Sequence, residues 1–413
     1  MMVGMDFDAI LDRYADLAVH VGVGLHPGQR MELRTPIAAA PLARRIAAAA
    51  YRAGASYVTV RYSDDEIAKI RFAEAPEDSF EEVELGRAEA MERMAARGDA
   101  FVSIDASDPE ALKAADPARV ATARVATQRA MKPFMRYTMA DRVPWTILAA
   151  PEPAWAAKVF PNEDRDGAVA KLWEAIFAAT RMDHDDPVAA WTEHVATLAA
   201  RAETLSQRRY DALHFRGPGT DLTVGLADGH VWKGGGSTTP DGQRFVPNLP
   251  TEEVFTAPHA ERVHGTVRAS LPLSYGGRLI DGFSLSFEDG RVVAARAETG
   301  QEVLDQLLQS DEGARRLGEV ALVSIDSPIY RSGLLFYETL YDENAASHIA
   351  LGRAYRMCVD GGPNMSDEQA GAAGLNDSLV HVDFMIGTPE TDVDGLHADG
   401  RKEPLMRSGR FVV

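Results

Sequence analysis

The chain is poor in cysteine, in basic residues and in long apolar runs, and each shortage excludes a class of protein. Its one cysteine, Cys358, permits neither an intramolecular disulfide nor a zinc site held by several thiolates. Its 62 Asp and Glu residues outnumber its 43 Lys and Arg residues, which gives a formal net charge of −19. We therefore expect no nucleic acid and no anionic membrane as partners, because both require a basic surface. No apolar run approaches the roughly 18 residues of a membrane-spanning helix. The acidic N-terminus lacks the pattern of a signal peptide, so we expect a cytoplasmic protein.

The order of helix-like and strand-like patterns predicts two domains, an α/β domain at residues 1–210 and a β-rich α+β domain at residues 211–413. In the first part, strand patterns at 30–35, 57–63, 100–106 and 145–151 alternate with helical patterns at 6–21, 40–55, 79–98 and 109–140, and further helical patterns follow at 168–181 and 187–209. This alternation predicts an open, mostly parallel sheet with helices. After Arg209, short strands separated by Asp-Gly and Gly-Gly pairs predict hairpins.

Several common catalytic motifs are absent from the sequence. It contains neither the H-E-x-x-H of single-zinc metalloproteases nor the G-x-S-x-G of serine hydrolases. The glycines of GVGLHPG at residues 22–28 follow a helical pattern and have the wrong spacing for a dinucleotide loop, so they indicate a helix stop. KGGGSTT at residues 233–239 is not a phosphate-binding loop, because no Gly-Lys-Ser/Thr follows it.

Candidate catalytic residues gather in four short stretches of the second half. The stretches are NLPTEEVFTAP (248–258) with Glu252 and Glu253, RRLGEVALVSI (315–325) with Glu319, LYDENAASHIALGRAY (340–355) with Asp342, Glu343, His348 and Tyr355, and SLVHVDFMIG (378–387) with His381 and Asp383. Each stretch taken alone is compatible with a structural role, such as a solvated turn, a strand-edge acid or a hydrogen-bonded core histidine. Only the four stretches taken together predict that the β-rich domain is the catalytic domain.

The spacing of these residues restricts how they can act. Adjacent residues of an extended segment point to opposite sides, so Glu252 and Glu253 have different roles. His348 and Tyr355 are seven residues apart, and they share a face if their segment is helical. His381 and Asp383 lie on one face of a strand whose neighbours are apolar, where burial costs several kcal/mol unless each group is paired or bound.

Carboxylate and imidazole groups without thiolates form a ligand set that suits Zn²⁺, Co²⁺ or Mn²⁺. Three or more carboxylates with two histidines exceed the three protein ligands that one catalytic zinc normally uses. The surplus predicts two divalent metal ions that share a bridging carboxylate at a separation of about 3.5–4 Å.

The four stretches, in this order and at these separations, resemble the signature segments of the thermophilic aminopeptidase family, the metal-dependent exopeptidases that include aminopeptidases T and S. VGVGLHPGQ near the N-terminus adds to a resemblance that covers essentially the whole chain. The resemblance implies a two-metal aminopeptidase that acts as a homodimer on peptide substrates with a free N-terminus, with broad preference for the N-terminal residue. It also implies that Tyr355 lies in the active site and that the metal ligands are Glu253, Glu319, Glu343, His348, His381 and Asp383.

We expect Glu319 to bridge the two ions, Tyr355 to donate a hydrogen bond to the oxyanion, and Glu252 to act as the general base. Two alternatives follow from the residues. The same ligands would serve another dinuclear metal hydrolase, a phosphoesterase or an amidase, with Arg331, Arg353 and Arg356 available to hold a phosphoryl group. A non-catalytic binding protein would use these acids and histidines as internal salt bridges, and its stability would be indifferent to a chelator.

Overall fold

The computed structural model describes residues 6–106, 108–276 and 278–413, which form two compact units. Unit 1 comprises Met1–Glu193 and Gly236–Pro250, and unit 2 comprises His194–Gly235 and Thr251–Val413. The division into domains at residue 210 stays a prediction. The boundaries of the compact units differ from that division, because the chain crosses into unit 2 at His194 and returns to unit 1 at residues 236–250.

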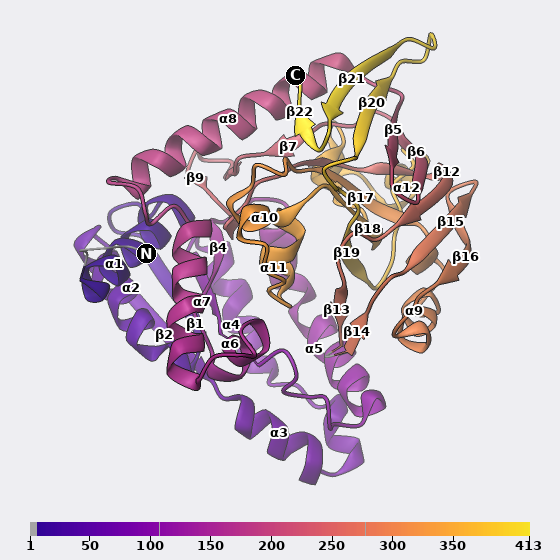
Figure 1. Ribbon diagram of the computed structural model, residues 1–413. Helices are drawn as coiled ribbons and strands as arrows, with labels where there is room; N and C mark the ends of the chain where they lie inside the picture. Colours follow the sequence, from indigo (N-terminus) through magenta and orange to yellow (C-terminus); the bar gives the residue numbers. More distant parts are fainter. Residues whose placement is uncertain (1–5, 107, 277) are drawn as a thin grey trace. The chain divides into compact units, whose positions relative to one another are not determined.

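Unit 1 contains a five-stranded parallel sheet in the order β10-β4-β3-β1-β2 (Figure 1). Its strands are β1 (Arg30–Pro36), β2 (Tyr57–Ser63), β3 (Ala100–Asp105), β4 (Trp145–Ala149) and β10 (Asn248–Leu249), and the short pair β8 (Ser237–Thr238) and β9 (Arg244–Phe245) lies outside this sheet. The predicted parallel sheet with helices is therefore confirmed. Its fifth strand was not predicted, since β10 is only two residues long and lies far along the chain.

Helices connect the strands of unit 1. They are α1 (Phe7–Leu17), α2 (Ala40–Arg52), α3 (Asp65–Glu74), α4 (Leu85–Ala96), α5 (Pro117–Thr138), α6 (Pro153–Val159), α7 (Arg165–Ala179) and α8 (Pro187–Arg208), the last of which continues into unit 2. The helix predicted at 79–98 begins only at Leu85, because Glu77–Glu81 forms a separate 3₁₀ turn after Pro76. Helix α3 was not predicted, since it buries no residue and so has no apolar stripe in its sequence.

Unit 2 consists mainly of two antiparallel sheets, in the orders β19-β18-β17-β11-β7 and β16-β15-β12-β6-β5-β20-β21-β22 (Figure 1). The first sheet contains β7 (Lys233–Gly234), β11 (Val254–Thr256), β17 (Leu317–Leu322), β18 (His348–Gly352) and β19 (His381–Met385). The second contains β5 (Ala212–Gly217), β6 (Thr220–Leu226), β12 (Pro258–Arg268), β15 (Ser284–Glu288), β16 (Arg291–Arg296), β20 (Asp392–Leu396), β21 (Lys402–Arg407) and β22 (Arg410–Phe411). A hairpin of β13 (Leu273–Tyr275) and β14 (Arg278–Ile280) and the short helices α9 (Gln301–Leu308), α10 (Pro328–Ser332), α11 (Thr339–Asp342) and α12 (Asp367–Ala372) complete the unit. The predicted β-rich second part is confirmed.

One hydrophobic core joins the two sheets of unit 2. It combines Phe215 and Leu222 of the larger sheet with Ile349 and Phe384 of the smaller one. The ring of Phe384 lies 5.1 Å from that of Phe283, between centroids. The smaller sheet packs one face against this core, so the opposite face of the same sheet can carry polar side chains.

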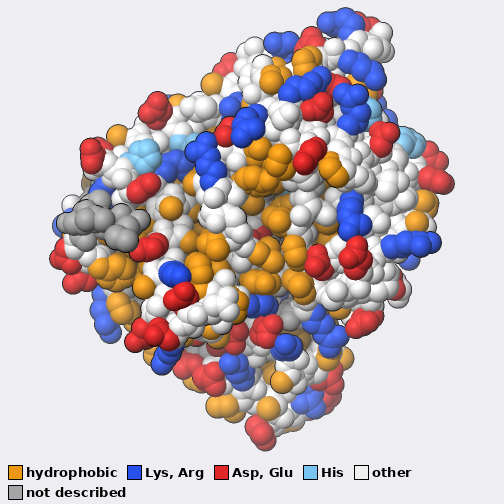
Figure 2. All heavy atoms as spheres, in the orientation of Figure 1, with side chains coloured by type: hydrophobic (Ala, Val, Ile, Leu, Met, Phe, Trp, Pro, Cys, Tyr) orange, Lys and Arg blue, Asp and Glu red, His pale blue; other side chains and the backbone are white. Residues whose placement is uncertain are grey.

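The surface agrees with the composition of the chain. Acidic and basic side chains are interspersed over the described residues on the face shown in Figure 2. Among the residues that the structure describes, no helix combines the length and the apolar character that crossing a bilayer requires.

Candidate metal centre

Strands β17, β18 and β19 carry the acids and histidines on one face and core-forming apolar side chains on the other. Strand alternation and pairing assign to the first face Glu319, His348, Ala350, Gly352, His381 and Asp383. The opposite face carries Val320, Leu322, Ile349, Leu351, Val382 and Phe384, all in the hydrophobic core. The apolar alternation in the sequence therefore directs the acids and histidines to one surface.

A β-bulge turns Glu319 onto this surface. Leu317 and Glu319 would share a face in a regular strand, but the pairing of β17 with β18 shifts between them, so Leu317 enters the core and Glu319 leaves it. The residue between them is Gly318, where a Cβ atom would lie 2.2 Å from the carbonyl oxygen of Arg353. Only glycine fits this close approach, and the orientation of Glu319 depends on it.

The pairing of the strands brings two carboxylates into one row. Glu319 of β17 lies opposite Ala350 of β18, and Ala350 lies opposite Asp383 of β19. His381 lies opposite Gly352 in the next row. Strand β18 thus contributes its smallest side chains where its two neighbours, β17 and β19, contribute charged ones, which leaves room between the two carboxylates.

Within the described residues, two groups of possible metal ligands have donor atoms within 4.8 Å of one another. One group is Glu253, Glu319 and His348, and the other is Glu319, His381 and Asp383. Glu319 belongs to both: its Oε1 lies 3.6 Å from Nε2 of His348, and its Oε2 lies 3.6 Å from Nε2 of His381. Such spacing is compatible with donor–metal distances of about 2 Å.

Three donor atoms of this cluster are buried without a hydrogen-bond partner in the described part of the chain, namely Glu253 Oε2, His348 Nε2 and Asp383 Oδ1. Nε2 of His348 approaches Oε2 of Glu253 to 3.0 Å, but the two atoms do not have the geometry of a hydrogen bond. Leaving such atoms unsatisfied costs about 1–3 kcal/mol each, and more for charged groups. Divalent cations held by the two groups would satisfy all three atoms, so the donor set fits metal ions.

The two histidines are oriented as ligands by their other ring nitrogens. Nδ1 of His381 donates to the carbonyl oxygen of Arg353 at 2.7 Å, and Nδ1 of His348 donates to that of Ala346 at 3.2 Å. With the proton on Nδ1, the lone pair of Nε2 faces the carboxylates. Backbone carbonyls of this kind commonly fix the tautomer of a metal-binding histidine.

The cluster concentrates negative charge in a buried place. Burial, offset in part by His348, raises the pKa of Glu319 to about 7. Burial also raises the pKa of Glu343 well above its usual value, and Asp383 adds to the rise. For His381, burial lowers the pKa, but Asp383 and Glu319 outweigh it and bring the pKa to about 9. The carboxylates thus favour bound positive charge, whether protons or metal ions.

The neighbouring acids Glu252 and Glu253 point to different partners, in agreement with the extended geometry expected from the sequence. Glu253 faces His348, whereas Oε2 of Glu252 lies 3.6 Å from Nε2 of His194. The backbone N–H of Glu252 donates to Oδ1 of Asn344 at 2.7 Å. Glu252 belongs to neither of the two ligand groups.

Glu343 lies at the edge of the cluster, in the 3₁₀ turn Glu343–Ala345 that precedes β18. It belongs to neither 4.8 Å group, but it lines a cavity together with Asp383. The buried Asn344 places this turn, because its Nδ2 donates to the carbonyl oxygen of Leu340 at 3.0 Å and lies 3.4 Å from Oε1 of Glu343.

Tyr355 lies beside the cluster, and no helix brings it there. His348 opens strand β18 and Tyr355 follows that strand, so the segment is not helical and the face that the two would share in a helix does not arise. The strand forms because His348–Gly352 pairs on both sides, with β17 and with β19. The ring of Tyr355 nevertheless lies 4.6 Å from that of His381, between centroids. Burial and the nearby carboxylates raise the pKa of Tyr355 well above its usual value, so its hydroxyl keeps its proton.

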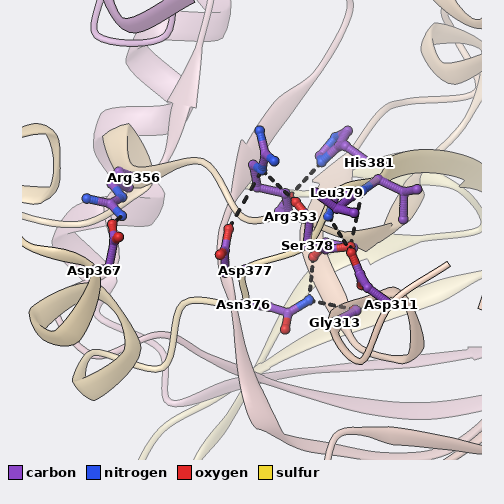
Figure 3. Close-up of polar contacts among 12 residues, drawn as sticks. Asp311, Gly313, Arg353, Arg356, Asp367, Asn376, Asp377, Ser378, Leu379 and His381 are labelled. Carbon is purple, nitrogen blue, oxygen red and sulfur yellow. Dashed lines mark hydrogen bonds and ion pairs between the residues drawn. The ribbon is translucent and has the colours of Figure 1, made fainter. Parts of the chain in front are cut away.

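The arginines considered for a phosphoryl clamp make other contacts. Arg331 pairs with Asp326 at 3.1 Å, and Arg356 pairs with Asp367. Nε of Arg353 donates to the carbonyl oxygen of Ser378 at 2.8 Å (Figure 3). No observation therefore favours a phosphoesterase over a peptidase.

Sequence reasoning missed two residues that support the ligands, Asn344 and Asp311. Asn344 adjoins Glu343 in the DENAASHIALG stretch, so its position was a usable signal. Asp311 lies in a loop outside every candidate stretch, and its contacts with Ser378 and Leu379 exist only in the folded chain.

Comparison with known proteins gives full-length matches. A family described as "Thermophilic metalloprotease (M29)" matches residues 7–411. Aminopeptidase 2 of Geobacillus stearothermophilus is 50% identical over 402 residues, which are 97% of each chain. Aminopeptidase T of Thermus thermophilus is 51% identical over 407 residues, covering 98% of this chain and 99% of the relative. The solved structure "Wild-type AmpT from Thermus thermophilus" matches with a TM-score of 0.94 at 50% identity, over 99% of this chain and 100% of that one.

Proposed function

The chain belongs to the thermophilic metalloprotease (M29) family and is a metal-dependent aminopeptidase, and we propose that it works through two divalent ions bridged by Glu319. One observation carries this proposal: each carboxylate oxygen of Glu319 lies 3.6 Å from Nε2 of a different histidine. Glu253 and His348 would hold one ion with Glu319. His381 and Asp383 would hold the other, and Glu343 would be the sixth ligand.

The chemistry divides between the ions and the protein. When bound, the ions supply Lewis acidity, which polarises the scissile carbonyl and lowers the pKa of a water molecule towards neutrality. Tyr355 keeps its proton at neutral pH and donates a hydrogen bond to the carbonyl oxygen as negative charge develops on it. Glu252 takes the proton of the attacking water and passes it to the leaving amine.

A cavity beside the ligands supports action on free N-termini. Leu273, Met385, Glu338, Glu343 and Asp383 are among its lining residues. Carboxylates beside an apolar wall suit a substrate end that carries an α-ammonium group and a side chain. An acetylated N-terminus would lack the charge and would keep only one N–H donor.

Two measurements test the proposal. Amino-acid p-nitroanilides are assayed beside their N-acetylated forms, with and without EDTA and with Zn²⁺, Co²⁺ or Mn²⁺ added back. We expect cleavage of the free amines alone, loss of activity in EDTA, and recovery on addition of metal. Elemental analysis of the reloaded protein should give two ions per chain, and one ion per chain would contradict the bridge.

We also propose that the enzyme is a homodimer, as the resemblance to the family implies. Light scattering after size-exclusion chromatography decides between one and two chains, and a monomer with full activity would exclude a role for dimerisation in catalysis.

A further inference from the structure

The start of strand β19, which carries His381 and Asp383, is tied to a loop far away in sequence. Asp311 lies between α9 and the 3₁₀ turn Gly313–Arg315. Its Oδ1 accepts a hydrogen bond from Oγ of Ser378 at 2.8 Å, and its Oδ2 accepts one from the backbone N–H of Leu379 at 2.5 Å (Figure 3). Oδ1 also accepts from the N–H of Ala314 at 2.8 Å, which fixes the carboxylate in its own loop.

The segment held by Asp311 in turn holds the backbone that orients His381. The carbonyl oxygen of Ser378 accepts a hydrogen bond from Nε of Arg353 at 2.8 Å, and that of Val380 accepts one from the N–H of Arg353 at 2.7 Å. The carbonyl oxygen of Arg353 then accepts from Nδ1 of His381. Figure 3 shows the contacts that lead from Asp311 through Ser378 and Arg353 to His381.

Asn376 makes a second connection between the loop of Asp311 and the strands of the site. Its buried Nδ2 donates to the carbonyl oxygen of Gly313 at 2.8 Å and to that of Gly352 at 2.6 Å. Gly352 is the β18 residue paired with His381, and Gly313 lies two residues after Asp311. The loop of Asp311 is therefore joined both to the ligand strand and to its neighbour.

We propose that Asp311 is a positioning residue for the metal centre, which sets the ring of His381 through Ser378 and Arg353. This inference rests on the proposed function, in which His381 and Asp383 are metal ligands. An aspartate suits the position because an ionised carboxylate accepts several hydrogen bonds at once and makes each of them stronger. Residues that orient a metal-binding histidine typically change metal affinity 10–100-fold when they are replaced.

The test compares Asp311→Asn with Asp367→Asn. Asparagine has the size of aspartate but only one acceptor oxygen, so either Leu379 or Ala314 loses its acceptor. Asp367 is a matched control, because its carboxylate pairs with Arg356 near the same site and its side chain is 96% exposed. Ser378→Ala is a milder change of the same contact and serves if Asp311→Asn does not fold.

The readouts are the affinity for Zn²⁺, by competition with a chromophoric chelator, and kcat and KM as functions of added metal. For Asp311→Asn we expect one of two Zn²⁺ ions to bind 10–100-fold more weakly, with kcat restored by excess Zn²⁺ and KM within twofold of the wild-type value. Ser378→Ala should show the same pattern to a smaller extent, and Asp367→Asn should show none.

The inference would be overturned if Asp311→Asn or Ser378→Ala lowered only the melting temperature and left the Zn²⁺ affinity unchanged. Asp311 would then contribute to the stability of the fold alone. An equal loss of affinity in Asp367→Asn would also overturn the inference, because it would indicate a general charge effect. Failure of the proposed function is a separate result, since the wild-type protein itself would then bind no second ion.

Discussion

Replacement of the bridging ligand should stabilise the metal-free protein. The pKa of Glu319 is raised from 4.5 to about 7 in the folded chain, chiefly by burial. At pH 8 the folded protein must hold this carboxylate ionised in an unfavourable place, whereas the unfolded chain ionises it freely. A rise of this size costs about 3 kcal/mol of unfolding free energy, at 1.36 kcal/mol per pH unit. Glu319→Gln has nearly the same shape and no charge, and it avoids this cost.

The dependence on pH has a defined sign. Because the folded chain retains the proton of Glu319 to higher pH than the unfolded chain does, the stability of the metal-free wild type falls as the pH rises from 4.5 to 7. The penalty is complete above pH 7. The advantage of Glu319→Gln should therefore shrink from about 3 kcal/mol at pH 8 to about 1 kcal/mol at pH 5.

The assay is thermal unfolding after dialysis against EDTA, at pH 5 and pH 8, for both proteins. In a unit of roughly 200 residues, 1 kcal/mol shifts Tm by about 2–4 °C, so Glu319→Gln should melt about 6–12 °C higher at pH 8. After reloading with Zn²⁺ the order should reverse, because the variant lacks the shared ligand. A metal-free variant that melts at or below the wild-type temperature at pH 8 would refute this account of Glu319.

Three further outcomes are expected. Tyr355→Phe should lower kcat by about 10²–10³ while metal content and KM stay near the wild-type values, because only the oxyanion hydrogen bond is lost; unchanged kcat would exclude that role. Glu252→Gln should lower kcat with both ions retained, whereas Glu253→Gln should lose metal by elemental analysis, and near wild-type kcat in Glu252→Gln would remove Glu252 as the general base. Leu222→Ala, in β6 and fully buried, should cost about 2–5 kcal/mol of stability in denaturant unfolding without changing kcat at 25 °C.

The sequence predicted elements well where one local pattern decides the structure. Alternating apolar residues at 378–387 predicted the strand of His381 and Asp383, and β19 confirms it. For the segment of His348 and Tyr355 the sequence left a helix open, and pairing with two strands decides the outcome instead. Sequence reasoning also could not place Glu319, because the bulge at Gly318 depends on the approach of the carbonyl oxygen of Arg353, which directly follows β18.

The features that escaped sequence reasoning are those that convert separate acids into one site. Charged ligands on β17 and β19 would collide with a large side chain on β18, which lies between them, and Ala350 and Gly352 avoid this. The bulge then directs Glu319 towards the space above Ala350, and the core on the other face holds all three strands in register. The resulting site is electrostatically unfavourable without a cation, as the raised pKa values of Glu319 and Glu343 show. Affinity for metal is therefore obtained at the expense of the stability of the metal-free fold. A substitution that stabilises the metal-free fold by removing a ligand's charge should weaken the binding of metal.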